Sequence, residues 1–181
     1  ATQFSHLLIA DGWLGHFNHV RIKDGTRFDV PEDFYQQLRG SGGSASKAGV
    51  CIQYEFDVKS GKILDLTITP ANRPDYVDAR DTMDNVEAGD LVIRDLGYFV
   101  LAPLRNMISK DAQIISRLNT KVTVYTQNEN GLKELDFVKL YNKMNKNKTD
   151  RIEMQVYIGE KVLLPIRLII ELLPDIIYEQ R

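Results

Sequence analysis

Residues 89–99, GDLVIRDLGYF, constrain the fold of this chain more than any other segment. The apolar run from Leu91 to Ile93 predicts a short buried strand, and Asp95 comes soon after it, ahead of a glycine and an aromatic pair. A carboxylate is thus expected at the carboxyl end of a core strand. Ligands and metal ions bind at that edge of open α/β sheets, because the loops there vary while the strands stay rigid. Asp95 is therefore the first candidate for a functional residue.

A second segment of the same kind lies earlier in the chain. Residues 20–28, VRIKDGTRF, alternate apolar and basic side chains, which predicts a strand with one buried face that ends at Asp24 and turns at Gly25. Asp-Gly is a common turn pair and needs no function of its own. The case for Asp24 therefore depends on Asp95, because the same arrangement, an acid that follows a predicted strand, occurs at both positions.

The other predicted elements define a mixed α/β sheet. Residues 50–56 and 62–68 predict a hairpin closed by Gly61, and Asp57 and Asp65 beside it are expected to be solvated or turn residues. Further helices are expected at residues 2–18, 31–40, 75–86 and 101–108, and a strand at residues 113–118. Antiparallel strands followed by helical crossovers give a mixed sheet with flanking helices, in which the first strand can lie beside the fourth. Asp24 and Asp95 would then face one groove.

Two aspartates at one groove favour a metal site. They repel each other, and neither is stable as an anion without a cation between them. Mg²⁺ or Mn²⁺ suits an all-oxygen site, and a third acid would allow two ions about 4 Å apart. Such a pair of ions activates a water or a 3′-hydroxyl and stabilises the leaving oxygen of a phosphodiester. The pattern indicates phosphoryl transfer, with Asp24 and Asp95 as metal ligands.

Composition excludes several other classes of protein. The 181 residues are 43% hydrophobic and 27% charged, which suits one globular core, and the single cysteine, Cys51, lies in an apolar run and indicates core packing in a reducing compartment. No segment has the apolar length of a membrane span or the pattern of a signal peptide, so a cytoplasmic protein is expected. The net charge of −2 argues weakly against a stand-alone nucleic-acid binder.

Two further patterns carry weaker signals. His16 and His19 have a spacing that could supply two zinc ligands on a helix, but no cysteine or carboxylate completes a familiar set, so packing is the favoured interpretation. Residues 40–49, GSGGSASKAG, do not match a P-loop, because Lys47 lacks the required preceding glycine. The loop amides and Lys47 could meet a DNA phosphate, although a plain connector is favoured.

From Asn119 the chain predicts antiparallel strands. Residues 121–127, 132–140, 151–158 and 163–172 alternate and are rich in Val, Ile and Tyr, with turns expected at residues 128–131, 142–150 and 159. Basic residues gather near the second turn, and they are either solvated or in contact with DNA phosphates: Lys139, Lys143, Lys146, Lys148 and Arg151. Lys143 and Lys146, together with Lys47, are the candidate nucleic-acid contacts.

Several segments together resemble a known family. VRIKDGTRFDVP, GSGGSASKAGVCIQYEFDVKSGKILDLTITP and AGDLVIRDLGYFVLAPL followed by ISRL are similar, in order, to bacterial insertion-sequence transposases of the DDE class, in the branch whose catalytic domain carries a β-rich insertion. The resemblance covers about residues 18–175. It implies an RNase H-like fold, two-metal cleavage and joining of transposon DNA ends, and three metal-binding acids. The first falls on Asp24 in KDGT and the second on Asp95 in RDLGY, while Thr26, Gly97 and Tyr98 match neighbouring positions with a supporting role.

The third acid of the family has no good match. It is a glutamate in a Tyr, Arg, Glu, Lys pattern on a helix, and Arg167 and Glu171 have the Arg-to-Glu spacing. Leu164 and Tyr178 stand where Tyr and Lys are required, and the segment reads as a strand. We therefore expect Glu171 to be a decoy and the true glutamate to lie beyond Arg181.

The combined prediction is a transposase catalytic-domain fragment, inactive alone. It has a helical segment at residues 1–18, an incomplete RNase H-like core at residues 19–118 and an inserted antiparallel β-rich subdomain at residues 119–181. The resemblance implies Mg²⁺ or Mn²⁺, double-stranded DNA as partner, a homodimer in the active complex and a place at the bacterial nucleoid. The alternatives are an RNase H-like nuclease, or a non-catalytic DNA-binding or assembly module descended from a transposase.

Overall fold

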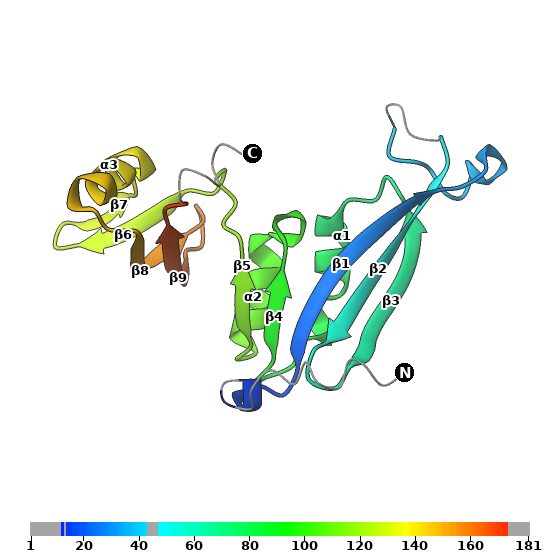
Figure 1. The fold of residues 1–181 in the computed structure, drawn as a ribbon, viewed down its shortest axis with the longest axis horizontal. Coiled ribbons are helices and arrows are strands. Elements are labelled where there is room, and N and C mark those ends of the chain that lie inside the picture. Colours follow the sequence, from blue (N-terminus) through cyan, green and yellow to red (C-terminus); the bar gives the residue numbers. More distant parts are fainter. Residues whose placement is uncertain (1–11, 13, 43–46, 174–181) are drawn as a thin grey trace. The chain divides into compact units, whose positions relative to one another are not determined.

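The computed structural model describes residues 12, 14–42 and 47–173, which form two compact units (Figure 1). The first unit ends at Leu118 and the second begins at Asn119. Within the described residues, no helix is long and apolar enough to cross a membrane.

The first unit is built on a five-stranded mixed sheet. Its strand order is β3-β2-β1-β4-β5. The first three strands pair antiparallel, whereas β4 and β5 run parallel to β1. The strands are β1 (Val20–Asp29), β2 (Gly49–Asp57), β3 (Lys62–Pro70), β4 (Leu91–Arg94) and β5 (Gln113–Ser116). This arrangement confirms the predicted α/β, RNase H-like fold class and places the first strand beside the fourth.

Helices cover one face of this sheet. Val92 of β4 is fully buried against Met107 of α2, with Val86 and Ala112 in the same cluster. Asp78 of α1 faces the same side, because it pairs with Lys23 of β1. The helical elements of this unit are η1 (Leu14–His16), η2 (Glu32–Phe34), α1 (Asp75–Asp81), η3 (Met83–Asn85), η4 (Leu96–Tyr98) and α2 (Leu101–Ser109), where η denotes a 3₁₀ turn.

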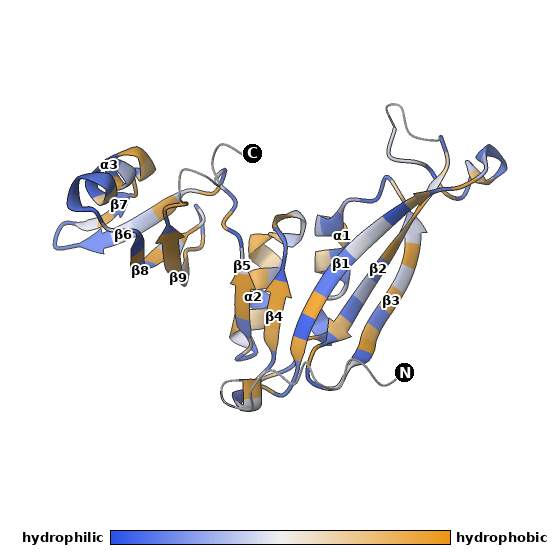
Figure 2. Cartoon of the chain, in the orientation of Figure 1, coloured by the Kyte–Doolittle hydropathy of each residue, from blue (hydrophilic) through white to orange (hydrophobic). Residues whose placement is uncertain are grey.

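The opposite face of the sheet has only partial cover in the described part of the chain. At one end Leu14 packs against Val20 and Leu91. Along the rest, apolar side chains of several strands are exposed, including Leu66 and Ile68 on β3. Figure 2 shows this alternation of hydrophobic and hydrophilic residues along β3.

The structure corrects the predicted turn at Gly25. Strand β1 continues past Asp24 to Asp29, and Gly25 pairs with Gln53 of β2. A Cβ at Gly25 would lie 2.9 Å from the Gln53 side chain. The glycine is therefore required for a close approach across the sheet rather than for a turn.

Two predicted helices are shorter than expected. Only the 3₁₀ turn η2 forms within residues 31–40, and residues 75–86 divide into α1 and η3 around Thr82. Helix α1 buries Asp78 and Ala79, while Tyr76 is exposed. Asp78 is turned inward because it pairs with the buried Lys23, so the polar side of α1 faces the sheet. Most of the helical segment expected at residues 2–18 lies outside the described residues, which show only η1 there.

The second unit is a four-stranded antiparallel sheet with one helix. Its strand order is β7-β6-β8-β9, and the strands are β6 (Val124–Asn128), β7 (Gly131–Glu134), β8 (Arg151–Ile158) and β9 (Leu164–Glu171). Its buried side chains come from three strands and the helix: Val124, Met144, Val156, Ile158, Leu164 and Leu168. That this unit is an insertion in a larger core stays a prediction.

The helix of this unit, α3 (Phe137–Asn147), corrects a second prediction. A strand was expected over residues 132–140 and a turn over 142–150, but β7 ends at Glu134. The Asp136 side chain accepts a hydrogen bond of 2.9 Å from the Lys139 backbone N–H and so caps the helix. Leu140 and Met144, four residues apart, form its inward side.

Candidate metal centre

Parallel pairing of β1 and β4 places Asp24 and Asp95 next to each other. Lys23 is the register partner of Arg94, and each is followed directly by one of the two aspartates. The backbone of Asp95 is still extended (φ −77°, ψ 170°). Neighbouring strands lie about 4.8 Å apart, and residues in register point to the same face. By this register the two aspartates fall on one face of the sheet, each one position beyond the last paired residues of β1 and β4.

Both carboxylates face solvent. The Asp95 side chain is 67% exposed, and its Oδ1 lies 3.8 Å from Nη1 of Arg117, which is too long for a hydrogen bond. Oδ1 of Asp24 accepts a hydrogen bond of 2.8 Å from the Gly25 backbone N–H. The pair thus retains carboxylate oxygens that can bind a cation, and their mutual repulsion favours one.

The donor set fits a hard divalent cation in part. Carboxylate oxygens suit Mg²⁺ and Mn²⁺, and neither aspartate has a thiol beside it that would select a softer metal. In the part of the chain that the structure describes, no group of three or more His, Cys, Asp or Glu side chains gathers as a metal site would require. A metal site at Asp24 and Asp95 would therefore need a further ligand.

The residues that precede the two aspartates point to the other face and are buried. Nζ of Lys23 lies 2.8 Å from Asp65 and 2.7 Å from Asp78, and it donates to the hydroxyl of Thr82. Asp65 is therefore not the solvated turn residue that was expected. A lysine inside the protein is stable as a cation only when carboxylates surround it, and these contacts fix β1 against β3 and α1.

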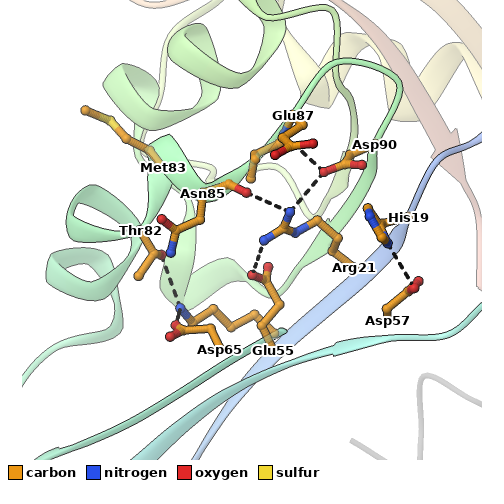
Figure 3. A network of polar contacts seen from close by, with 12 residues as sticks. His19, Arg21, Glu55, Asp57, Asp65, Thr82, Met83, Asn85, Glu87 and Asp90 are labelled. Carbon is orange, nitrogen blue, oxygen red and sulfur yellow. Dashed lines mark hydrogen bonds and ion pairs between the residues drawn. The ribbon is translucent and has the colours of Figure 1, made fainter. Parts of the chain in front are cut away.

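Glu55 of β2 joins the two strands that carry the aspartates, and Figure 3 shows its contact with Arg21 of β1. It is fully buried and accepts from Nη2 of Arg21 on β1 at 2.8 Å and from Nη2 of Arg94 on β4 at 2.6 Å. Arg21 also donates to Asp90 at 3.0 Å. Burial lowers the pKa of Arg94, although the charge of Glu55 opposes this. This network, Arg21, Glu55, Arg94 and Asp90, ties β1, β2 and the start and end of β4 together.

A second chain of polar contacts begins at Tyr98. Its hydroxyl donates to Oε1 of Gln53, whose Nε2 donates to Asp75 at 2.8 Å. Burial, followed by the charges of Asp75, Asp78 and Asp24, raises the pKa of Tyr98, so the phenol remains a neutral donor.

Gly97 lies against the same aspartate of α1. A Cβ at Gly97 would come within 2.8 Å of Asp75 Oδ2, so only glycine fits there without movement of that side chain. Gly97 and Tyr98 thus have contacts that suit supporting residues rather than metal ligands.

Asp57 is a further buried acid that was expected to be solvated. It accepts hydrogen bonds from the Val20 backbone N–H at 2.9 Å and from the Ser60 hydroxyl at 2.6 Å, and lies 3.0 Å from Nδ1 of His19. Burial would raise its pKa, but the bonds from His19, Ser60, Val20 and Lys59 outweigh burial and lower it well below the usual range. His19 therefore has a structural partner in Asp57.

None of the remaining candidates lies on β1 or β4. Lys47 is exposed and 3.5 Å from Glu32. Lys143 and Lys146 are exposed on α3 of the second unit. Glu171 is on strand β9, 3.3 Å from Arg151, rather than on a helix.

The fold and the paired acids agree with the comparison to protein families. Residues 15–173 match the model of the transposase DDE domain, and the chain belongs to this family. The family generally uses divalent metal ions, in keeping with the two carboxylates.

Among known proteins, the chain is similar to several transposases of insertion sequences. It is 36% identical over 170 residues to the transposase of IS231B from Bacillus thuringiensis subsp. berliner, which covers 87% of this chain and 35% of that protein. It is 34% identical over 174 residues to the transposase of IS231F from B. thuringiensis subsp. israelensis, covering 89% and 36%. The transposase of IS1151 from Clostridium perfringens is 25% identical over 173 residues, covering 88% and 36%. The chain thus spans about a third of the length of these relatives.

Proposed function

We propose that this chain is part of the catalytic domain of a DNA transposase and that Asp24 and Asp95 bind a divalent cation, Mg²⁺ or Mn²⁺, at the phosphodiester to be cut. The observation that supports the proposal is the register of β1 and β4, in which Lys23 pairs with Arg94 and each is followed directly by one of the two aspartates. The family of the chain and the names of its relatives support the same activity.

The residues of this chain have distinct tasks in the proposal. Asp24 and Asp95 supply oxygen ligands, and Arg117 is the cation that leaves Asp95 when metal binds. The buried Glu55 network holds β1 and β4 in register, so the two carboxylates are positioned before metal arrives. When bound, the metal activates a water or a 3′-hydroxyl and stabilises the leaving oxygen.

The third acid is proposed to come from a part of the longer protein beyond Arg181. Glu171 is a poor candidate, because it lies on a strand of the second unit and is paired with Arg151. The chain spans about a third of its relatives, so a protein of their length would have room for a further catalytic helix.

The proposed partners are double-stranded DNA, namely transposon ends and target, and a second copy of the longer protein in the active complex. The proposed place of action is the bacterial nucleoid. These follow from the resemblance to transposases and from the names of the relatives.

The experiment is cleavage and joining of labelled transposon-end DNA by the longer protein with Mg²⁺. Asp24→Asn and Asp95→Asn should each reduce both reactions roughly a thousandfold, because a metal supplies several kcal/mol to phosphoryl transfer. Asp29→Asn is the matched control, since Asp29 is exposed on the same strand, five residues further on, and should leave activity unchanged.

Two outcomes would contradict the proposal. Full activity of both aspartate variants would show that Asp24 and Asp95 do not hold a metal ion needed for the reaction. Hydrolysis without joining of a DNA end with a free 3′-hydroxyl would identify a nuclease instead of a transposase.

A further inference from the structure

Helix α3 presents a row of lysines to solvent. Lys139, Lys143 and Lys146 are spaced four and three residues apart, so they lie on one side of the helix. All three are exposed, and the Lys139 side chain is 84% exposed. Residues 137–148 contain four lysines, counting Lys148, and no acidic residue. We call Lys139, Lys143 and Lys146 the lysine face of α3.

The lysine face is far from the buried side of the helix. Met144 is the one residue of α3 that is fully buried, and Leu140 is half-buried. Most of the helix surface is therefore available to a partner. Lys139 lies 3.0 Å from Asp136, whereas the structure shows no ion pair for Lys143, Lys146 or Lys148 with any described residue.

The composition of α3 is not explained by helix stability. Asn142, Asn145 and Asn147 alternate with the lysines, and asparagine is a poor helix former. Lys148 caps the helix in the left-handed region (φ 51°, ψ 45°), where glycine or asparagine is favoured. Lysines near the carboxyl end do interact favourably with the helix dipole, but Lys139 and Lys143 are too far from that end to do so.

We propose that the lysine face of α3 binds the phosphate backbone of double-stranded DNA. Lys139 and Lys146 are about 10 Å apart along the helix axis, at 1.5 Å per residue. A row of this length can contact more than one phosphate of a strand, since phosphates follow one another about every 3.4 Å along the duplex axis. Asn142, three residues after Lys139 and four before Lys146, lies beside this row and donates a hydrogen bond to a phosphate oxygen. The inference rests on the proposed function in one respect, namely that the substrate is duplex DNA.

The test is binding of the 181-residue chain to a fluorescent 30-base-pair duplex, followed by anisotropy over a range of salt concentrations. The double variant Lys143→Gln, Lys146→Gln should reduce the slope of log Kd against the logarithm of the salt concentration by about 2, since each phosphate contact contributes about 1. It should also weaken binding roughly tenfold or more at low salt. The matched control is Lys62→Gln with Lys161→Gln, which removes the same charge at exposed sites on other elements and should change little.

A third variant separates binding from folding. Lys148→Gly removes a charge at the end of α3, near the lysine face, and also relieves the left-handed backbone conformation. Its melting temperature should be equal to or higher than that of the unaltered chain, while its affinity for DNA falls. A loss of stability without a loss of affinity would contradict a binding role.

Other outcomes would overturn the DNA-binding proposal and leave the metal-site proposal unaffected. Equal effects of the two double variants would show a general charge effect. Polyglutamate that binds the chain as tightly as DNA would point to an acidic protein partner. Asp24→Asn should abolish the response of the chain to metal and leave its affinity for the duplex unchanged, so the two proposals fail separately.

Discussion

Replacement of either aspartate at the candidate metal centre should stabilise the metal-free protein. Two unit charges about 5 Å apart repel by about 0.8 kcal/mol in bulk water and about 3 kcal/mol at an effective dielectric of 20. Both side chains are exposed, so the lower figure applies, and Asp24→Asn should raise the free energy of unfolding by about 1 kcal/mol. That corresponds to a rise in melting temperature of about 2–4 °C. Asp95→Asn should gain less, because it also loses the attraction of Arg117.

Divalent metal should make the unaltered chain more stable than the two aspartate variants. At a concentration ten times its Kd, Mn²⁺ stabilises a protein that binds it by about 1.4 kcal/mol. The unaltered chain should therefore melt at a higher temperature with Mn²⁺, whereas Asp24→Asn and Asp95→Asn should not respond. Differential scanning fluorimetry with and without metal measures both effects, and Asp29→Asn serves as the control that keeps the response. Destabilisation by both aspartate replacements, or no metal response in the unaltered chain, would refute the reasoning.

Three further predictions concern residues around the site. Glu55→Gln leaves two buried arginines without their carboxylate and should lower the free energy of unfolding by roughly 3 kcal/mol, measured by urea denaturation. At Asp57, burial raises the pKa but hydrogen bonds outweigh it, so the folded pKa lies below the unfolded value of about 3.9. The ionised Asp57 therefore stabilises the folded chain above that pH, and this stabilisation is lost as the pH falls through the folded pKa. Asp57→Asn should therefore flatten the decline of stability below about pH 4, measured by thermal melting across acid pH. Arg117→Gln removes the cation beside Asp95 and should tighten Mn²⁺ binding about twofold by calorimetry, since exposed pairs contribute less than about 1 kcal/mol.

The sheet could be predicted because its signals are local. The alternation in residues 50–56 and the apolar run at Leu91 specify strands without reference to the rest of the chain, and β2 (Gly49–Asp57) and β4 (Leu91–Arg94) formed there. The adjacency of the first and fourth strands followed from the order of elements, since a strand after a helical crossover joins the sheet in parallel.

The buried charges could not be predicted from local patterns. Asp57 and Asp65 flank a turn, and their burial depends on His19 and Lys23, which are 38 and 42 residues away. Charges at every second position of residues 21–23 and 55–57 were a usable signal, because such a period on strands marks one charged face.

The predictions at Gly25 and α3 were wrong for the same reason, since both conformations depend on tertiary contacts that local patterns do not show. The Asp-Gly pair was interpreted as a turn, but its conformation is set by Gln53 on the next strand. The Lys- and Asn-rich segment before Asp150 was interpreted as a turn, and its helix depends on burial of Met144 and on the cap at Asp136.

The central claim is that Asp24 and Asp95 hold one divalent cation between them. Paramagnetic relaxation by Mn²⁺ in the NMR spectrum of the isotope-labelled chain tests it directly, because the ion broadens amide signals near its site. Low concentrations of Mn²⁺ should broaden the signals of residues 23–26 and 94–98 first, and Asp24→Asn or Asp95→Asn should abolish this broadening. Broadening that begins elsewhere, or persists in both variants, would contradict it.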